Sequence, residues 1–286
     1  MLIASLLYIL ECLAVILPSS FIYGITRFGS ILCLLLLKDR RLGIRANQRR
    51  LHPEWTSREL NASVRAVFEE TAAYYADTAL MAHRSPQTIL ENQLTISGFN
   101  YLQQSINDKR GLVLVGAHLS NPEIPFRALA AVNIERRRTE NQSNNAIAIV
   151  QSVSDQKQLA AIQQRRTTMG VRFVPTTTQG IRTAIKTLRN GGIVAILADR
   201  NTQGSGICVP FAGHLANFPS GSIELALRTN SNLLIGLAIR KKFDQFEVHF
   251  IPCDTLIKTD NRMLDINTNL TKLIQRLEPT IISHSD

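Results

Sequence analysis

The chain has 286 residues, enough for one large hydrophobic core, and no Pro/Gly/Ser-rich linker divides it. Its formal net charge of +10 indicates an acidic partner, which could be nucleic acid, an anionic membrane or a phosphorylated substrate. No aromatic-interleaved basic stripe or known nucleic-acid motif occurs, so nucleic acid is the least favoured of these partners. The cysteines have neither metal-ligand nor disulfide spacing, and we expect buried, reduced thiols in a cytoplasmic compartment at Cys12, Cys33, Cys208 and Cys253.

The N-terminal region is strongly apolar. Residues 2–17 are apolar apart from Glu11, and residues 19–37 are apolar apart from Arg27 and a few small polar residues. Neither stretch has the roughly 18 uninterrupted apolar residues of a transmembrane helix, so we predict a membrane-embedded or interfacial helical pair. The alternative is a helical pair buried against the rest of the chain. A basic start and a small-residue cleavage site are absent, so we expect no removal as a signal peptide.

A basic cluster follows this apolar region directly. Such a position suits contact with anionic lipid head groups. If the apolar region inserts into a membrane, these charges are expected to keep the remaining chain on the cytoplasmic side. The cluster consists of Lys38, Arg40, Arg41, Arg45, Arg49 and Arg50.

The remaining chain alternates apolar strands with amphipathic helices. A helix is predicted between residues 49 and 83, with Thr56 and Ser57 as start signals, and a short strand followed by a helix after Gly98 is predicted between residues 94 and 109. Further strands are predicted at or near residues 111–118, 147–153, 171–175, 193–197, 207–211, 233–240 and 246–253. Further helices are predicted at residues 123–132, 155–169, 180–190, 219–228 and 265–277. This order indicates an α/β fold with a mostly parallel central sheet flanked by helices. The alternating pattern of residues 246–253 indicates an edge strand.

His118 ends a predicted buried strand, and a helix start follows it at once. Ser120 and Asn121 can cap that helix, Pro122 suits its first position, and Glu123 falls in its first turn. His118 is therefore predicted at the carboxyl end of a strand. Open α/β sheets bind their ligands along that edge.

A carboxylate five residues after a histidine can turn back onto its ring and fix the tautomer. No serine or cysteine nucleophile stands beside His118, so the pair with Glu123 would deprotonate a substrate hydroxyl, as in acyl transfer to an alcohol. His249 and Asp254 have a comparable spacing, but His249 lies within a predicted strand and is interpreted as an exposed strand residue. The alternative for His118 is a structurally satisfied histidine at a strand end.

Two further sites carry polar groups. Asp199 and Arg200 follow the predicted strand 193–197 and are expected at the same sheet edge as His118, although Asp199 could simply cap a turn. Arg166 lies near the end of a predicted helix, where it could offset the helix dipole. Alternatively, its guanidinium could hold a phosphate or a developing oxyanion. Arg165 competes for this role.

Several blocks of the chain resemble the bacterial lipid A biosynthesis (lauroyl/myristoyl) acyltransferase family, whose relatives include the phosphatidylinositol mannoside acyltransferases. Their order and spacing agree over about residues 40–275. The blocks are His118-Leu-Ser-Asn-Pro-Glu123, Arg166 with Gly170, Leu197-Ala-Asp-Arg200, Gly206-Ile-Cys-Val-Pro-Phe-Ala-Gly213 and Pro219-Ser-Gly-Ser-Ile-Glu-Leu-Ala226.

The resemblance implies a membrane-associated O-acyltransferase without a metal or other cofactor. His118 would act as general base on a glycolipid hydroxyl, with Glu123 orienting it, and the acyl donor would be a thioester of acyl carrier protein or coenzyme A. The substrate-binding residues implied are Asn121, Arg166, Asp199 and Arg200. The enzyme would lie at the bacterial inner membrane with residues 38–286 as a cytoplasmic catalytic domain and residues 1–37 as its membrane-associating part.

The acceptor is less defined than the reaction. A lipid A precursor is expected, and a phosphatidylinositol mannoside or a lysophospholipid is the alternative. The Asp199-Arg200 pair resembles the phosphatidylinositol mannoside enzymes, Pro122 replaces a large residue common in relatives, and the chain lacks their Pro-Glu-Gln-Trp-like block. From another class, a noncatalytic membrane lipid-binding protein is the competing interpretation.

Overall fold

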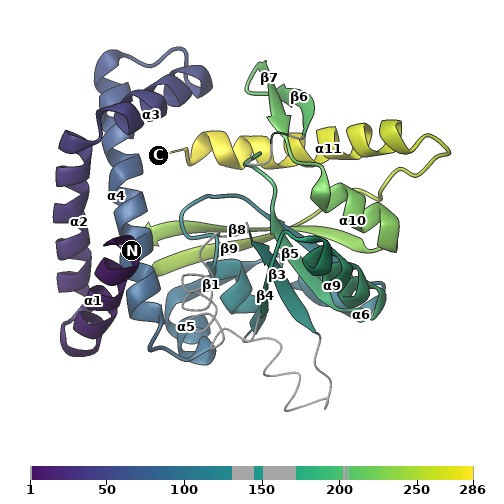
Figure 1. Cartoon of the computed structure of the whole chain (residues 1–286), viewed down its shortest axis with the longest axis horizontal. Coiled ribbons are helices and arrows are strands. Elements are labelled where there is room, and N and C mark those ends of the chain that lie inside the picture. Colours follow the sequence, from purple (N-terminus) through teal and green to yellow (C-terminus); the bar gives the residue numbers. More distant parts are fainter. Residues whose placement is uncertain (1, 131–144, 151–171, 202–203, 205, 286) are drawn as a thin grey trace.

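The computed structural model describes residues 2–130, 145–150, 172–201, 204 and 206–285. Figure 1 shows a helical N-terminal part at one end of the molecule, a central sheet beside it, and a long C-terminal helix along one face of that sheet. Two predictions lie outside the described residues, namely the helix at 155–169 and, with it, the positions of Arg165 and Arg166.

The N-terminal part consists of α1 (Leu2–Ile16), α2 (Ser19–Leu36), α3 (Lys38–Leu51) and α4 (Ser57–Met81). The first three helices pack on α4, and α2 and α4 lie side by side (Figure 1). The single helix predicted between residues 49 and 83 is therefore wrong in its first part. Thr56, predicted as a start signal, caps α4: its side chain accepts the Glu59 N–H and the Glu59 carboxylate accepts the Thr56 N–H.

The central sheet is mostly parallel, as predicted. Its strand order is β1-β9-β8-β2-β5-β3-β4, and among these pairs only β8 and β9 run antiparallel within the described residues. The strands are β1 (Leu94–Ser97), β2 (Leu112–Gly116), β3 (Ala146–Val150), β4 (Arg172–Pro175), β5 (Ile193–Leu197), β8 (Asn232–Lys242) and β9 (Gln245–Pro252). The α/β fold class is thus confirmed.

The prediction that the strand at 246–253 lies at an edge is wrong. Strand β9 pairs with β1 on one side and with β8 on the other, so the short strand β1 forms the edge. The alternation has another cause. Phe246, Val248 and Phe250 are buried in one core cluster, whereas Glu247 and His249 between them remain partly exposed.

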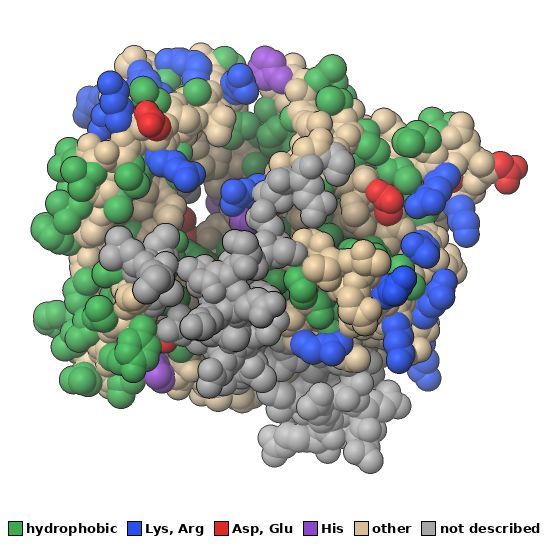
Figure 2. Space-filling view, viewed as in Figure 1, with side chains coloured by type: hydrophobic (Ala, Val, Ile, Leu, Met, Phe, Trp, Pro, Cys, Tyr) green, Lys and Arg blue, Asp and Glu red, His purple; other side chains and the backbone are tan. Residues whose placement is uncertain are grey.

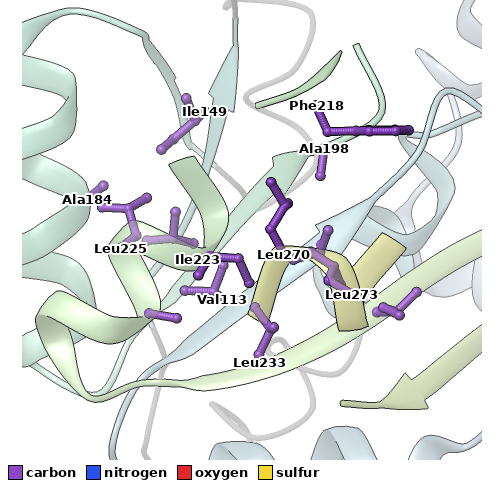
Figure 3. Packing of buried hydrophobic residues seen from close by; sticks show 14 of the residues in the cluster. Val113, Ile149, Ala184, Ala198, Phe218, Ile223, Leu225, Leu233, Leu270 and Leu273 are labelled. Atoms are coloured by element: carbon purple, nitrogen blue, oxygen red, sulfur yellow. The ribbon is translucent and has the colours of Figure 1, made fainter. Parts of the chain in front are cut away.

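Helices cover both faces of the sheet, and two hydrophobic clusters form the core. On strand β2, Val113 and Val115 join one cluster while Leu112 and Leu114 join the other, so every residue of the strand is buried. Figure 3 shows the first cluster, in which side chains of the sheet pack against α9, α10 and α11. The flanking helices are α5 (Pro86–Gln93), α6 (Phe99–Asn107), α9 (Thr178–Arg189), α10 (Gly221–Thr229) and α11 (Arg262–Ser283), together with residues 124–130.

A separate hairpin precedes α10. The strand predicted at 207–211 is present as β6 (Ile207–Phe211), but its antiparallel partner β7 (His214–Phe218) was not predicted. The turn between them places Ala212 at φ 49° and Gly213 at φ 73°. Two successive left-handed residues are characteristic of a tight hairpin turn, usually signalled by Asn-Gly, and Ala-Gly carries that signal weakly.

The burial predicted for the cysteines is wrong for most of them. Cys12, Cys33 and Cys208 are exposed, and only Cys253 is largely covered. Burial raises the pKa of the Cys253 thiol to about 12. Cys33 follows the exposed Leu32 on α2, whereas Leu10 and Leu13 beside Cys12 pack partly against the cluster around Ile22, so Cys12 lies on the outer face of α1.

Candidate functional site

His118 and Asp199 meet because the strands that precede them are adjacent and in register. Gly116 at the end of β2 lies opposite Leu197 at the end of β5, so the residues two positions later also come together. The Asp199 carboxylate accepts a hydrogen bond from His118 Nδ1 at 2.9 Å and another from the His118 backbone N–H at 2.9 Å. The pair therefore fixes both the ring and the backbone of His118.

This bond assigns the roles of the two ring nitrogens. A carboxylate only accepts hydrogen bonds, so Nδ1 carries the proton that it donates to Asp199. Nε2 of a neutral ring is then left without a proton and can accept one. The ring is partly exposed and lines a cavity, so a substrate hydroxyl can reach this nitrogen.

The predicted contact between Glu123 and the His118 ring is wrong, because Asp199 occupies that position. Glu123 is only 6% exposed, and its carboxylate accepts a hydrogen bond of 3.3 Å from the hydroxyl of Tyr74 on α4. The cause lies in the turn: Ser120 adopts a left-handed φ of 46°, and the helix starts at residue 124 rather than at Pro122. Glu123 therefore lies toward α4, although it still lines the same cavity as His118.

The cavity has a volume of about 880 Å³, within the range of ligand sites. It lies between α4, the carboxyl ends of the parallel strands, α10 and the end of α11, and Figure 2 shows a hollow beside the N-terminal helices. Its lining divides by chemistry. Polar groups come from His118, Glu123, Arg200, Asn201, Ser220 and Glu224, and apolar groups from Val67, Phe126, Ile149, Phe173, Ile181, Ile196 and Leu225.

The other predicted site residues have different positions. Arg200 is exposed and lines the cavity. Asn121 differs from the prediction of a substrate contact: it is buried and bonds to Asp77 and to the backbone N–H of Glu123. Arg166 lies outside the described residues. Within the described ranges, no three His, Cys, Asp or Glu side chains are grouped closely enough to hold a metal ion.

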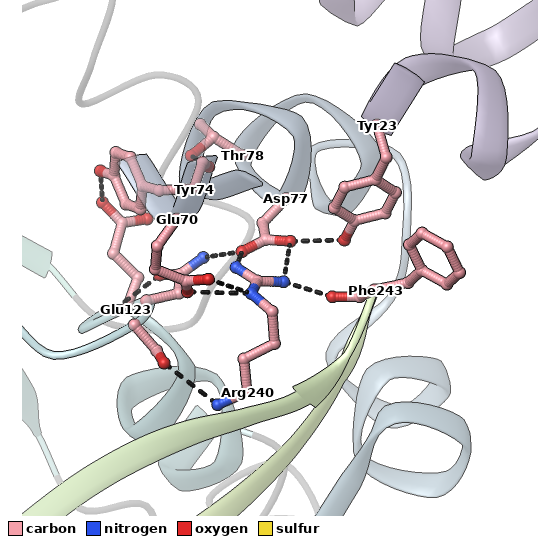
Figure 4. Close-up of polar contacts among 10 residues, drawn as sticks. Tyr23, Glu70, Tyr74, Asp77, Thr78, Glu123, Arg240 and Phe243 are labelled. Carbon is pink, nitrogen blue, oxygen red and sulfur yellow. Dashed lines mark hydrogen bonds and ion pairs between the residues drawn. The ribbon is translucent and has the colours of Figure 1, made fainter. Parts of the chain in front are cut away.

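A buried charged cluster behind the site was not predicted. Figure 4 shows Asp77 of α4 accepting hydrogen bonds from Tyr23 at 2.5 Å and from the Arg240 guanidinium at 2.6 and 3.0 Å. Burial raises the pKa of Asp77, whereas the Arg240 guanidinium acts in the opposite direction. Burial also opposes the charge on Arg240, but the carboxylates of Asp77 and Glu70 raise its pKa overall. An aspartate among the apolar residues Ala76, Ala79 and Leu80 was the available sequence signal.

Comparison with known proteins gives a match along nearly the whole chain. A family model described as bacterial lipid A biosynthesis acyltransferase matches residues 1–285. The matched range includes the N-terminal helices, His118, Asp199 and helix α11. No curated protein matches the chain.

Proposed function

Because the chain belongs to the bacterial lipid A biosynthesis acyltransferase family, we propose that it transfers a fatty acyl chain from a thioester donor to a hydroxyl of a glycolipid such as a lipid A precursor. The donor would be acyl carrier protein or coenzyme A carrying the acyl chain. The observation that supports this reaction best is the bond between His118 Nδ1 and Asp199, because it leaves Nε2 as a base in the cavity.

In the proposed reaction, His118 Nε2 takes the proton of the acceptor hydroxyl while the hydroxyl oxygen attacks the thioester carbonyl carbon. The new C–O bond gives a tetrahedral intermediate. When the C–S bond breaks, the leaving sulfur takes the proton from His118, and an ester and a thiol result. Asp199 stabilises the imidazolium between these steps, so positioned general-base catalysis supplies a factor of roughly 10² to 10⁴.

Charged residues around His118 would hold the substrates. Glu123 is a buried carboxylate at the cavity wall, so we assign it to accepting a hydrogen bond from a glycolipid hydroxyl. Arg200 lines the cavity and suits an anionic group of the donor or acceptor. Arg166 has the same proposed role from its family resemblance alone. No metal is required for this chemistry.

The N-terminal helices supply the proposed membrane contact. Among the described residues, α2 is the helix long and apolar enough to cross a membrane. Its exposed residues Phe21, Ile25, Phe28, Leu32 and Leu35 recur at intervals of three and four, forming one apolar stripe. In Figure 2, hydrophobic side chains gather over α1 and α2, and basic side chains gather over α3.

We assign residues 1–37 to membrane association and residues 38–286 to catalysis. An anionic inner membrane would contact both the apolar stripe and the basic helix α3, with the cavity on the cytoplasmic side. A phosphatidylinositol mannoside or a lysophospholipid is the alternative acceptor. The lipid that loses an acyl chain when the gene is deleted identifies it by mass spectrometry.

The test replaces His118 with alanine and measures thioester-dependent acylation of membrane glycolipids. We expect His118→Ala to lower kcat by roughly 10²- to 10⁴-fold, because the general base is lost. His249→Ala is the matched control: this histidine bonds to Ser97 outside the cavity and should leave kcat unchanged. Full activity of His118→Ala would refute the assignment. Saturable lipid binding by the wild type without thioester turnover would favour a noncatalytic lipid-binding protein instead.

A further inference from the structure

The residues 118–123, called here the His118 segment, are held from behind by the buried charged cluster. We infer that Asp77 and Arg240 are positioning residues of the site, and that Tyr23 couples the apolar helix α2 to the His118 segment through them. As far as this concerns catalysis, it rests on the proposed function. The geometry of the coupling stands on hydrogen bonds alone.

Two bonds attach the cluster to the segment. The backbone N–H of Arg240 donates to Ser120 Oγ at 3.0 Å, and Asn121 Nδ2 donates to Asp77 Oδ2 at 3.0 Å. Ser120 is in the left-handed region, which a residue with a side chain adopts only when its surroundings hold it there. The cluster thus fixes the turn that separates His118 from Glu123.

Asn121 passes this constraint to the catalytic side of the segment. Its Oδ1 accepts the backbone N–H of Glu123 at 3.0 Å, while its Nδ2 is bound to Asp77. A shift of the Asp77 carboxylate would therefore move the start of the helix at residue 124. Glu123 lies in the cavity wall, so such a shift would alter the site directly.

Asp77 itself has little freedom to move. The guanidinium of Arg240 contacts both of its oxygens, and Arg240 Nε bonds to the two oxygens of Glu70 at 2.9 Å each. The guanidinium also lies 4.7 Å from the centre of the Phe246 ring. A two-pronged contact between buried charges is specific in its geometry, so the pair acts as a rigid support.

Tyr23 connects helix α2 to the same carboxylate. Its hydroxyl donates to Asp77 Oδ1, and its ring is buried 5.6 Å from that of Phe243, whose backbone oxygen accepts from Arg240. Figure 4 shows Tyr23 reaching from α2 into the cluster that Asp77 and Arg240 form. The other face of α2 is exposed and apolar. A movement of α2 would therefore shift Tyr23 and Asp77, and with them the His118 segment.

A double-mutant cycle tests the coupling. We expect Tyr23→Phe to lower kcat about threefold to tenfold with an unchanged acceptor KM, because it removes one charge-assisted hydrogen bond without touching the cavity. Tyr8→Phe, an exposed change on α1, is the control and should change neither value. In an Asn121→Ala background the effect of Tyr23→Phe on kcat should be smaller, because only the bond from the Arg240 backbone N–H to Ser120 Oγ then joins the cluster to the segment.

Hydrogen exchange provides a readout that does not depend on activity. The backbone amides of Ser120, Asn121, Glu123 and Ile124 should exchange faster in Tyr23→Phe and remain unchanged in Tyr8→Phe, while those of β2 stay protected in both if the fold is intact. Equal behaviour of the two tyrosine variants, or additive effects in the cycle, would overturn the coupling. If the wild type transfers no acyl chain, the proposed function fails while the exchange experiment still decides the coupling.

Discussion

Two pairs, each formed by a carboxylate and a nitrogen base, hold the His118 segment, and they differ in burial. In the open pair, the side chains of His118 and Asp199 are 40% and 18% exposed. In the closed pair, those of Arg240 and Asp77 are 11% and 0% exposed. Both join a carboxylate to a nitrogen base, so the difference in burial separates their roles: the open pair can exchange a proton with a substrate, and the closed pair can only hold position.

The largest expected effect breaks the closed pair. Arg240→Met should lower the free energy of unfolding by about 3–5 kcal/mol, because it leaves the Asp77 carboxylate buried without its cation. Lys241→Met is the matched control: its side chain is 62% exposed, and its ion pair with Glu247 should be worth less than about 1 kcal/mol. Chemical denaturation followed by circular dichroism measures both. Equal losses would show that burial does not distinguish these cations.

The destabilisation caused by Arg240→Met should depend on pH. Burial raises the pKa of Asp77 and the Arg240 guanidinium lowers it, so Arg240→Met should raise this pKa further, and the folded variant should bind a proton that the unfolded state releases at the same pH. That proton stabilises the folded protein at low pH, and the stabilisation is lost as pH rises through the folded pKa. The loss caused by Arg240→Met should therefore be smaller near pH 5 than near pH 8.

Breaking the open pair should have a smaller effect on stability, and its main effect should be on kcat. Asp199→Asn should lower kcat by about 10²-fold, because the amide cannot stabilise the imidazolium, yet change the unfolding free energy by less than about 1 kcal/mol. The ¹⁵N chemical shift of His118 Nδ1 should change in Asp199→Asn but not in Glu123→Gln. A change caused only by Glu123→Gln would return the orienting role to that carboxylate.

Sequence reasoning located most of the parts of this site but not their pairing. Apolar strands ended by His118 and by Asp199 were predicted at one sheet edge, and both lie there. The partner of the ring was nevertheless assigned to Glu123, because that carboxylate is nearer in sequence. Strand β5 lies beside β2 although β3 and β4 come between them in the chain, and no local pattern reveals that adjacency.

The closed pair was not predicted at all, again because its partners come from elements whose adjacency no local pattern reveals. Asp77 and Arg240 are 163 positions apart, so even though the apolar neighbours of Asp77 hint at its burial, no local pattern pairs it with Arg240. Helix α4 was predicted from its periodicity and its start signal at Thr56, and these are local properties of the sequence. Local signals therefore gave the elements, whereas contacts between elements decided which charged residues serve chemistry and which serve position.

The smallest expected effect concerns the exposed end of α4, the helix that carries Asp77. Thr56→Ala removes the capping box and should lower the thermal midpoint by about 2 °C, with Arg58→Ala as an exposed control in the same turn. The hydrogen bonds from Thr56 lower the pKa of Glu59, so the cap stabilises the fold above the ordinary glutamate pKa and loses that effect as pH falls through the folded pKa. The midpoints of variant and wild type should therefore converge in acid, whereas kcat near neutral pH stays unchanged because the closed pair remains intact. A large loss of kcat would mean that the start of α4, far along the helix from Asp77, also positions the His118 segment.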